Sequence, residues 1–185
     1  FTNSLLVGTS STGTLSSADG ITGVGTGVLA ALTSGDSNVA VGLSSLAANT
    51  TGIQNTALGF KTLCANTTAS GNIAVGAFSL QTNTEGLSNV AIGAAANTTT
   101  GGCNTVVGMG ALNINTTGLG NVAIGCGALN ANTTGVDNTA VGCGALTTNT
   151  TASANTALGR AALRLNTTGD DNVALGRNAM CSNTT

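Results

Sequence analysis

Five cysteines are the side chains in this sequence best suited to metal or redox chemistry. Their spacing fits neither a C-x-x-C metal pattern nor an even disulfide framework, and the chain has no histidine to complete a zinc site. The sequence therefore predicts no metal site and no cofactor. The five are Cys64, Cys103, Cys126, Cys143 and Cys181.

Eight asparagines stand two residues before a threonine and so satisfy the acceptor pattern for N-linked glycosylation. They are Asn49, Asn66, Asn97, Asn115, Asn132, Asn149, Asn166 and Asn183. One interpretation is that sugars on outward-pointing asparagines keep a surface with few charges soluble. The other is that Asn and Thr build a turn, since Asn tolerates the left-handed backbone region and Thr bonds to nearby backbone. The sequence leaves both interpretations open.

The chain offers little for catalysis. Because it has no histidine, no serine, threonine or cysteine has an evident base to activate it. Gly-x-Gly elements such as residues 23–25 recur without a following helix, which argues against a phosphate-binding loop. We expect a protein that is not an enzyme.

Charge and composition argue against two classes of partner. Net charge is −2, charged residues are 5% and aromatic residues 2% of the chain, so neither a basic stripe nor stacking rings are present for nucleic acid. No run of about 18 apolar residues occurs, so the sequence predicts no membrane-spanning helix. Phe1 opens the chain without a basic and apolar leader, and we expect a processed mature chain or a fragment.

A repeat of seventeen residues must position all of these side chains. Blocks begin at Ser4, Ile21, Asn38, Asn55, Asn72, Asn89, Asn104, Asn121, Asn138, Asn155 and Asn172, and only the step from Asn89 to Asn104 is shorter, at fifteen. A fixed short period predicts structural units that stack on their neighbours. We expect a single repeat domain over residues 1–185, with degenerate terminal coils over 1–37 and regular coils over 38–185.

Within a block, short β-prone runs alternate with Gly and Asn, which predicts two brief strands and two turns. Glycine recurs too often for a stable helix. The fold class is therefore all-β, a parallel β-solenoid or β-roll of about eleven 17-residue coils. With strands about 4.8 Å apart, the coils make a rod on the order of 50 Å long.

Residue size predicts which positions face inward, counting from the first residue of each block. Position four holds Val41, Leu58, Val75, Ile92, Val107, Ile124, Val141, Leu158 and Leu175. Position nine holds Leu29, Leu46, Leu63, Leu80, Leu112, Leu129, Leu146, Leu163 and Met180. We expect both columns to form the core. Position three is almost always Ala, and because neighbouring strand residues face opposite sides, we expect another chain or a neighbouring element to cover this column from outside the coil.

Stacking also places identical polar residues above one another. The asparagines at position one, which no acceptor pattern follows, are expected to form a hydrogen-bonded ladder. They are Asn38, Asn55, Asn72, Asn89, Asn104, Asn121, Asn138, Asn155 and Asn172. Cys126 and Cys143 share position six in neighbouring blocks, so their Cα atoms are expected about 4.8 Å apart. That separation allows a disulfide, and two small buried thiols are the alternative.

The runs NVAIGCGAL at 121–129 and NVAIGAAA at 89–96 resemble the head repeats of trimeric autotransporter adhesins. The resemblance implies a left-handed parallel β-roll assembled as a trimer. The full pattern NTAxGxxALxxNTTGxx resembles repeat arrays of tail-fibre-like and large surface proteins. The blocks here are three residues longer than the usual adhesin head repeat. Position six, often Tyr in the fibre arrays, is variable.

These patterns favour a structural subunit or segment of an extracellular fibre at a cell or virion surface. Such a chain would self-assemble through its stacked coils as a homo-oligomer, end-to-end polymer or trimer, with a coat of glycans if the acceptor asparagines are used. An adhesin or tail-fibre segment that binds a host surface is the alternative. An ice-binding β-solenoid is a minor alternative, which consecutive threonines disfavour because they point to opposite sides.

Overall fold

The computed structural model describes residues 4–8, 17–93 and 98–185, and each of the eleven blocks contributes one strand of three residues. The strands are β1 (Leu5–Val7), β2 (Thr22–Val24), β3 (Val39–Val41), β4 (Thr56–Leu58), β5 (Ile73–Val75), β6 (Val90–Ile92), β7 (Thr105–Val107), β8 (Val122–Ile124), β9 (Thr139–Val141), β10 (Thr156–Leu158) and β11 (Val173–Leu175). Across the described ranges, no helix is long and apolar enough to cross a membrane.

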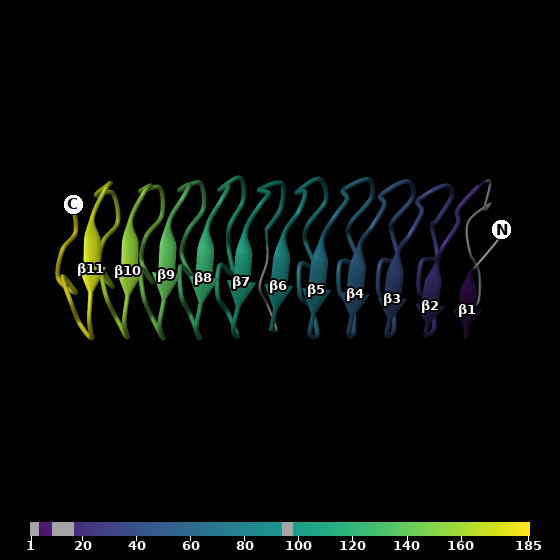
Figure 1. Cartoon of the computed structure of the whole chain (residues 1–185), viewed down its shortest axis with the longest axis horizontal. Helices are drawn as coiled ribbons and strands as arrows, with labels where there is room; N and C mark the ends of the chain where they lie inside the picture. The colour runs from purple at the N-terminus through teal and green to yellow at the C-terminus, as the bar shows by residue number, and fades with distance from the viewer. Residues whose placement is uncertain (1–3, 9–16, 94–97) are drawn as a thin grey trace.

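All eleven strands form one parallel sheet in chain order, from β1 to β11 (Figure 1). The register repeats with the sequence, so that Val122, Ala123 and Ile124 pair with Thr139, Ala140 and Val141. β6 and β7 keep this register although their block is two residues shorter. The prediction of an all-β parallel β-solenoid is therefore confirmed, while its left-handed sense stays a prediction.

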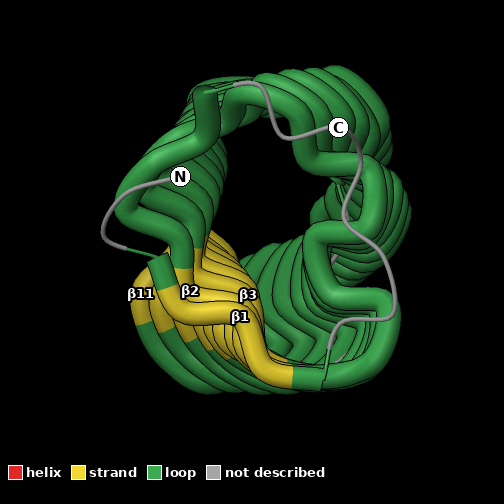
Figure 2. Tube along the Cα trace, turned by 90° about the vertical axis from the view of Figure 1, so that its right-hand side faces the viewer, coloured by secondary structure: helices red, strands yellow, loops and turns green. Residues whose placement is uncertain are grey.

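The prediction of two strands per block is wrong, because the second run is a stack of turns (Figure 2). The residue at position nine adopts a left-handed backbone with φ between 47° and 49° in every described block, which breaks an extended strand. These turns are still joined from coil to coil, for example by the Leu129 N–H, which donates to the Ala145 carbonyl at 3.0 Å. The coil is thus one short strand closed by stacked turns.

Glycine at position five lets the strand turn into the rest of the coil. Gly125 has a φ of +126°, a conformation that side chains with a Cβ rarely adopt. A Cβ at this site would also lie 2.7 Å from the carbonyl carbon of Gly142 in the next coil. Both the backbone angle and the close stacking therefore require glycine here.

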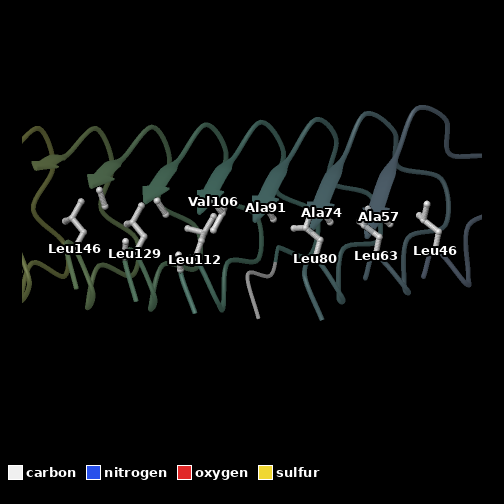
Figure 3. Close-up of a cluster of buried hydrophobic side chains, with 14 of the residues drawn as sticks. Leu46, Ala57, Leu63, Ala74, Leu80, Ala91, Val106, Leu112, Leu129 and Leu146 are labelled. Atoms are coloured by element: carbon white, nitrogen blue, oxygen red, sulfur yellow. The ribbon is translucent and has the colours of Figure 1, made fainter. Parts of the chain in front are cut away.

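The leucines at position nine form the core, as predicted. Leu29, Leu46, Leu63, Leu80, Leu112, Leu129, Leu146 and Leu163 are all 0% exposed. Figure 3 shows a row of these leucines with the small residues of the strands beside them. Met180, at the same position in the last block, is 42% exposed, so the prediction fails at that residue.

The prediction that position four faces inward is wrong, because the strands present this column to the outside. Ile124 is 37% exposed and Ile92 is 45% exposed, whereas Ala123 and Ala91 are 0% exposed. The expectation that another chain or a neighbouring element outside the coil covers the alanines is wrong for the same reason. The alanines pack inside their own coil, in one cluster with the leucines of position nine. Positions three and four do lie on opposite sides of the strand, but position three faces the interior and position four faces outward.

The reason is the small space between the strand and the turns opposite. At Gly23, which replaces Ala at position three, an added Cβ would lie 2.8 Å from Val28 and 3.4 Å from Leu29. The interior therefore has room for one row of large side chains, the leucines at position nine, and one row of small side chains facing it, the alanines at position three. Among the regular blocks, Val106 is the exception at position three, and it follows the only one of these blocks, residues 89–103, that contains no leucine.

Candidate functional site

Surfaces are the candidates for function in this rod. No pocket is found among the described residues. Within the same ranges, no group of three or more His, Cys, Asp or Glu side chains could hold a metal ion. The sheet's outer surface extends along all eleven strands, and the asparagine columns extend from the third block onward.

The sheet face, as we call the outward side chains at positions two, four and six of each block, is largely aliphatic. Its large residues that are at least about one-third exposed are Leu5, Val7, Val24, Val41, Leu43, Leu58, Phe60, Ile73, Ile92, Met109, Ile124, Leu158, Val173 and Leu175. Arg160 and Arg177 are the charged residues at these positions. An apolar surface of this length, with no lysine or glutamate along the strands, lacks the usual protection against pairing with another surface.

Two phenylalanines interrupt the regular pattern at one edge of the sheet face. The rings of Phe60 and Phe78 meet edge to face with centroids 5.0 Å apart. The Lys61 ammonium lies 5.5 Å from the Phe60 ring centroid. Both rings remain 38% exposed, so this group is the most distinctive local patch on the described surface.

Charges of opposite sign lie on opposite edges of the sheet face near β10 and β11. Arg160 and Arg177 occupy position six, after the strand, and both are exposed. Asp170 and Asp171 occupy positions sixteen and seventeen, just before β11, and are also exposed. The Asp170 carboxylate accepts a hydrogen bond from the Ser153 backbone N–H at 2.7 Å, which fixes it at its edge.

The predicted asparagine ladder at position one is confirmed. Asn138 donates through Nδ2 to Asn121 Oδ1 at 3.1 Å, and its backbone N–H donates to the same oxygen at 3.0 Å. Equivalent bonds join the column from Asn38 to Asn172, where the Asn172 backbone N–H donates to Asn155 Oδ1 at 2.9 Å. Eight of the nine side chains are fully buried and Asn172 is half-buried.

The acceptor asparagines at position twelve form a second ladder, so the expectation that they point outward is wrong. Asn132 is 0% exposed, and its Nδ2 donates to Asn115 Oδ1 at 2.9 Å and to the Gly135 carbonyl at 3.0 Å. Asn49, Asn66, Asn115, Asn149 and Asn166 are buried in the same way, and Asn183 is half-buried. Asn97 lies outside the described residues.

Position twelve lies beside the first ladder. The Gly135 carbonyl accepts from Asn121 at 2.8 Å as well as from Asn132, so one backbone oxygen joins the two columns. A glycan would be attached at Nδ2, the atom that makes these buried bonds. The geometry therefore favours the turn interpretation of the NTT tripeptide.

Two residues missing from the acceptor pattern belong to this second ladder. Asn83, followed by Thr-Glu, donates to Asn66 Oδ1 at 3.1 Å. Thr98 takes the place of asparagine in the short block, and its hydroxyl donates to Asn83 Oδ1 at 3.2 Å. Asn83 could have revealed the structural role of this column from the sequence, because it keeps the asparagine at position twelve without keeping the acceptor tripeptide.

No disulfide joins any of the five cysteines in the structure. Cys126 and Cys143 are exposed, so the alternative of two buried thiols is wrong, and the disulfide between them stays a prediction. Cys103 is also exposed, while Cys64 and Cys181 are half-buried. The exposed pair stands at position six, on the edge of the sheet face.

Comparison with known proteins finds no matching family model, no similar curated protein and no similar solved structure. The resemblance to adhesin-head and fibre repeats therefore rests on the quoted motifs. The repeat of about seventeen residues, the parallel solenoid and the two asparagine ladders stand on the geometry itself.

Proposed function

We propose that this chain is a structural rod segment of an extracellular fibre, joined side by side to a second copy of itself through the sheet face. The observation that supports it is the aliphatic column at position four, which runs along the sheet from β2 to β9 between aliphatic and threonine side chains, with no charged residue at positions two, four or six. The Lys61 ammonium lies at the edge of this surface, over the Phe60 ring. Exposed apolar surface on this scale favours association because burial removes it from water.

The sheet face is long and narrow. Eleven strands at a spacing of about 4.8 Å extend about 48 Å, and the three strand residues at positions two to four extend about 10 Å. The product is about 480 Å² on each partner before the position-six side chains are added, which is the size of a small protein interface. Two copies also share the same coil spacing, so the rows of aliphatic side chains on one fit between those of the other.

The charges at the edges favour a parallel pair. When two copies face each other about a twofold axis along the rod, the position-six edge of one lies against the position-sixteen edge of the other. Arg160 and Arg177 then approach Asp170 and Asp171 of the second copy at the same level of the rod. An antiparallel pair loses this match, because both copies place position six on the same edge.

The resemblance of the NVAIG-type runs to adhesin-head and tail-fibre repeats supports a location at a cell or virion surface. It also supports a role without catalysis. The buried ladders suit this role, since every coil is joined to the next by side-chain amides as well as by backbone bonds. Two sets of hydrogen bonds along the axis, from the backbone and from the side-chain amides, resist bending and local opening of a rod.

Electron microscopy and sedimentation velocity of the purified chain test the proposal. We expect paired or bundled rods for the parent chain and single rods for Ile124→Lys, because the new charge lies in the centre of the sheet face. Thr134→Lys is the matched control, since it adds the same charge at an exposed position on the turn side. Single rods for the parent chain, or equal loss of association in both variants, would contradict the proposal.

A host-surface adhesin is the second candidate, favoured by the group of Phe60, Phe78 and Lys61. It is a local break in an otherwise uniform surface, as expected for a receptor site. Loss of cell or glycan-array binding on Phe60→Ser and Phe78→Ser, with rods still assembled, would favour this function. Ice binding gains little support, because the Thr116 and Thr133 hydroxyls bond carbonyls of the next coil.

A further inference from the structure

Cys126 and Cys143 lie directly above one another in the coil stack. At this level of the rod, the carbonyl of position six accepts a hydrogen bond from the backbone N–H of position seven in the following coil. The Gly127 N–H donates to the Met109 carbonyl at 3.1 Å, and the Gly144 N–H donates to the Cys126 carbonyl at 3.0 Å. The same bond continues from Ala161 to Cys143 at 3.0 Å. The register of β8 and β9 therefore persists at position six, and the two exposed thiols are one coil apart.

Stacking allows either a disulfide or a bridging ion between these two thiols. Side chains that project in parallel from stacked coils leave their sulfur atoms near the coil spacing of about 4.8 Å. A disulfide requires the side chains to rotate until the sulfurs are about 2.05 Å apart, which the Cα spacing permits. A two-coordinate ion joins the thiols in their parallel orientation, because two bonds of about 2.3 Å, the length of a zinc–thiolate bond, span about 4.6 Å.

The neighbours in the same column are also suited to such an ion. Met109 lies one coil before Cys126, so three consecutive coils present a sulfur atom, the donor that soft ions such as Cu(I) prefer. Arg160 lies one coil after Cys143 and is exposed. A bis-thiolate complex of a monovalent ion carries one negative charge, which the guanidinium attracts.

We propose that Cys126 and Cys143 form a binding site for one soft monovalent ion of the Cu(I) class, held as a linear bis-thiolate between two coils. Binding forms two metal–sulfur bonds and releases the two thiol protons, so that Cu⁺ and two R–SH give [Cu(SR)₂]⁻ and two H⁺. No change of oxidation state is involved. The bound ion joins neighbouring coils at the surface, in addition to their internal ladders.

Anaerobic titration with Cu(I), competed by a chromophoric Cu(I) chelator and followed by native mass spectrometry, tests the site. We expect one copper ion held per single chain, with two protons released per ion. Cys126→Ala and Cys143→Ala should each lose this ion. Both variants should fold, because position six tolerates Leu43, Phe60 and Ala77 elsewhere in the rod.

Cys103→Ala is the matched control, since it removes an exposed thiol that has no cysteine one coil away. It should keep the ion. Equal loss of copper in Cys103→Ala, one ion shared between two chains, or a parent chain that binds none would overturn the site. Recovery of Cys126 and Cys143 as a disulfide from protein purified without reductant would also overturn it. Rod assembly is measured separately, so failure here leaves the proposed function untouched.

Discussion

Two groups of side chains hold each coil together by different chemistry. On the apolar side of the interior, Ala123 on the strand and Leu129 on the facing turns pack together, and their contact has no preferred direction. On the amide side, Asn121 and Asn132 share the Gly135 carbonyl, and both columns continue their bonds into the neighbouring coils. Hydrogen bonds are directional, so a shift of register leaves buried amides without partners. The apolar side stabilises the stack, and the amide side fixes its register.

Asn132→Asp should give the largest effect, because it places a buried carboxylate against two acceptors, Asn115 Oδ1 and the Gly135 carbonyl. A buried charge without a partner costs about 3–5 kcal/mol, which we expect as a loss of unfolding free energy in urea denaturation. Thr134→Glu is the control, since Glu85 already occupies this exposed position fourteen in another block. Similar losses in both variants would contradict the ladder.

Asn132→Thr sharpens the same test. Thr98 shows that a threonine hydroxyl can keep one ladder bond, to Asn83 at 3.2 Å. The loss should therefore be smaller than for the aspartate, about 1–3 kcal/mol, which is the cost of buried groups left unpaired. Amide hydrogen exchange should show a loss of protection in the neighbouring coil, around Asn149, whose side chain donates to Asn132.

Leu129→Ala tests the apolar side and should cost about 2–5 kcal/mol, because it empties part of a closed interior. Ile124→Ala removes a large side chain from the same coil, yet that side chain is 37% exposed, so the loss should stay below about 1 kcal/mol. The difference in urea midpoints between the two variants measures which column is inside. A larger loss for Ile124→Ala would contradict the orientation of the strands.

Val106→Ala tests whether this residue fills the space left by the block without leucine. Loss of two buried methyl groups should cost about 2 kcal/mol. Ala123→Val adds the same two groups where Leu129 already fills the interior, and overpacking should cost about 1–3 kcal/mol. Thermal unfolding of both variants provides the measurement, and a stabilising Ala123→Val would show that the interior has spare room.

Ala161→Gly should give the smallest effect, and with the opposite sign. Ala161 has a φ of +56° at position seven, at the turn that leaves the sheet face. Relief of about 1 kcal/mol of left-handed strain, partly offset by the greater freedom of glycine in the unfolded chain, leaves a gain of about 0.5 kcal/mol. Gly127→Ala should reverse it, because an added Cβ there meets no atom within 4 Å and only the strain remains.

The sequence by itself determined the period, the parallel register and the columns. Identical residues seventeen apart must stack, so the repeat predicts that Leu129 lies in the core and Asn121 in a ladder, and the structure has both there. Stacking also predicted that Cys126 and Cys143 share a column. These features depend only on spacing along the chain, which can be counted directly in a repeated sequence.

The tertiary structure decided which way each column faces. Alternation shows that Ala123 and Ile124 lie on opposite sides of a strand, but the inner side depends on how much space the leucines of the facing turns already occupy. The left-handed backbone at Leu129 likewise directs Asn132 inward, and no pattern of residue types reveals that bend. Spacing fixes neighbours along the axis, whereas the closure of the coil, which involves all seventeen residues together, sets inside and outside.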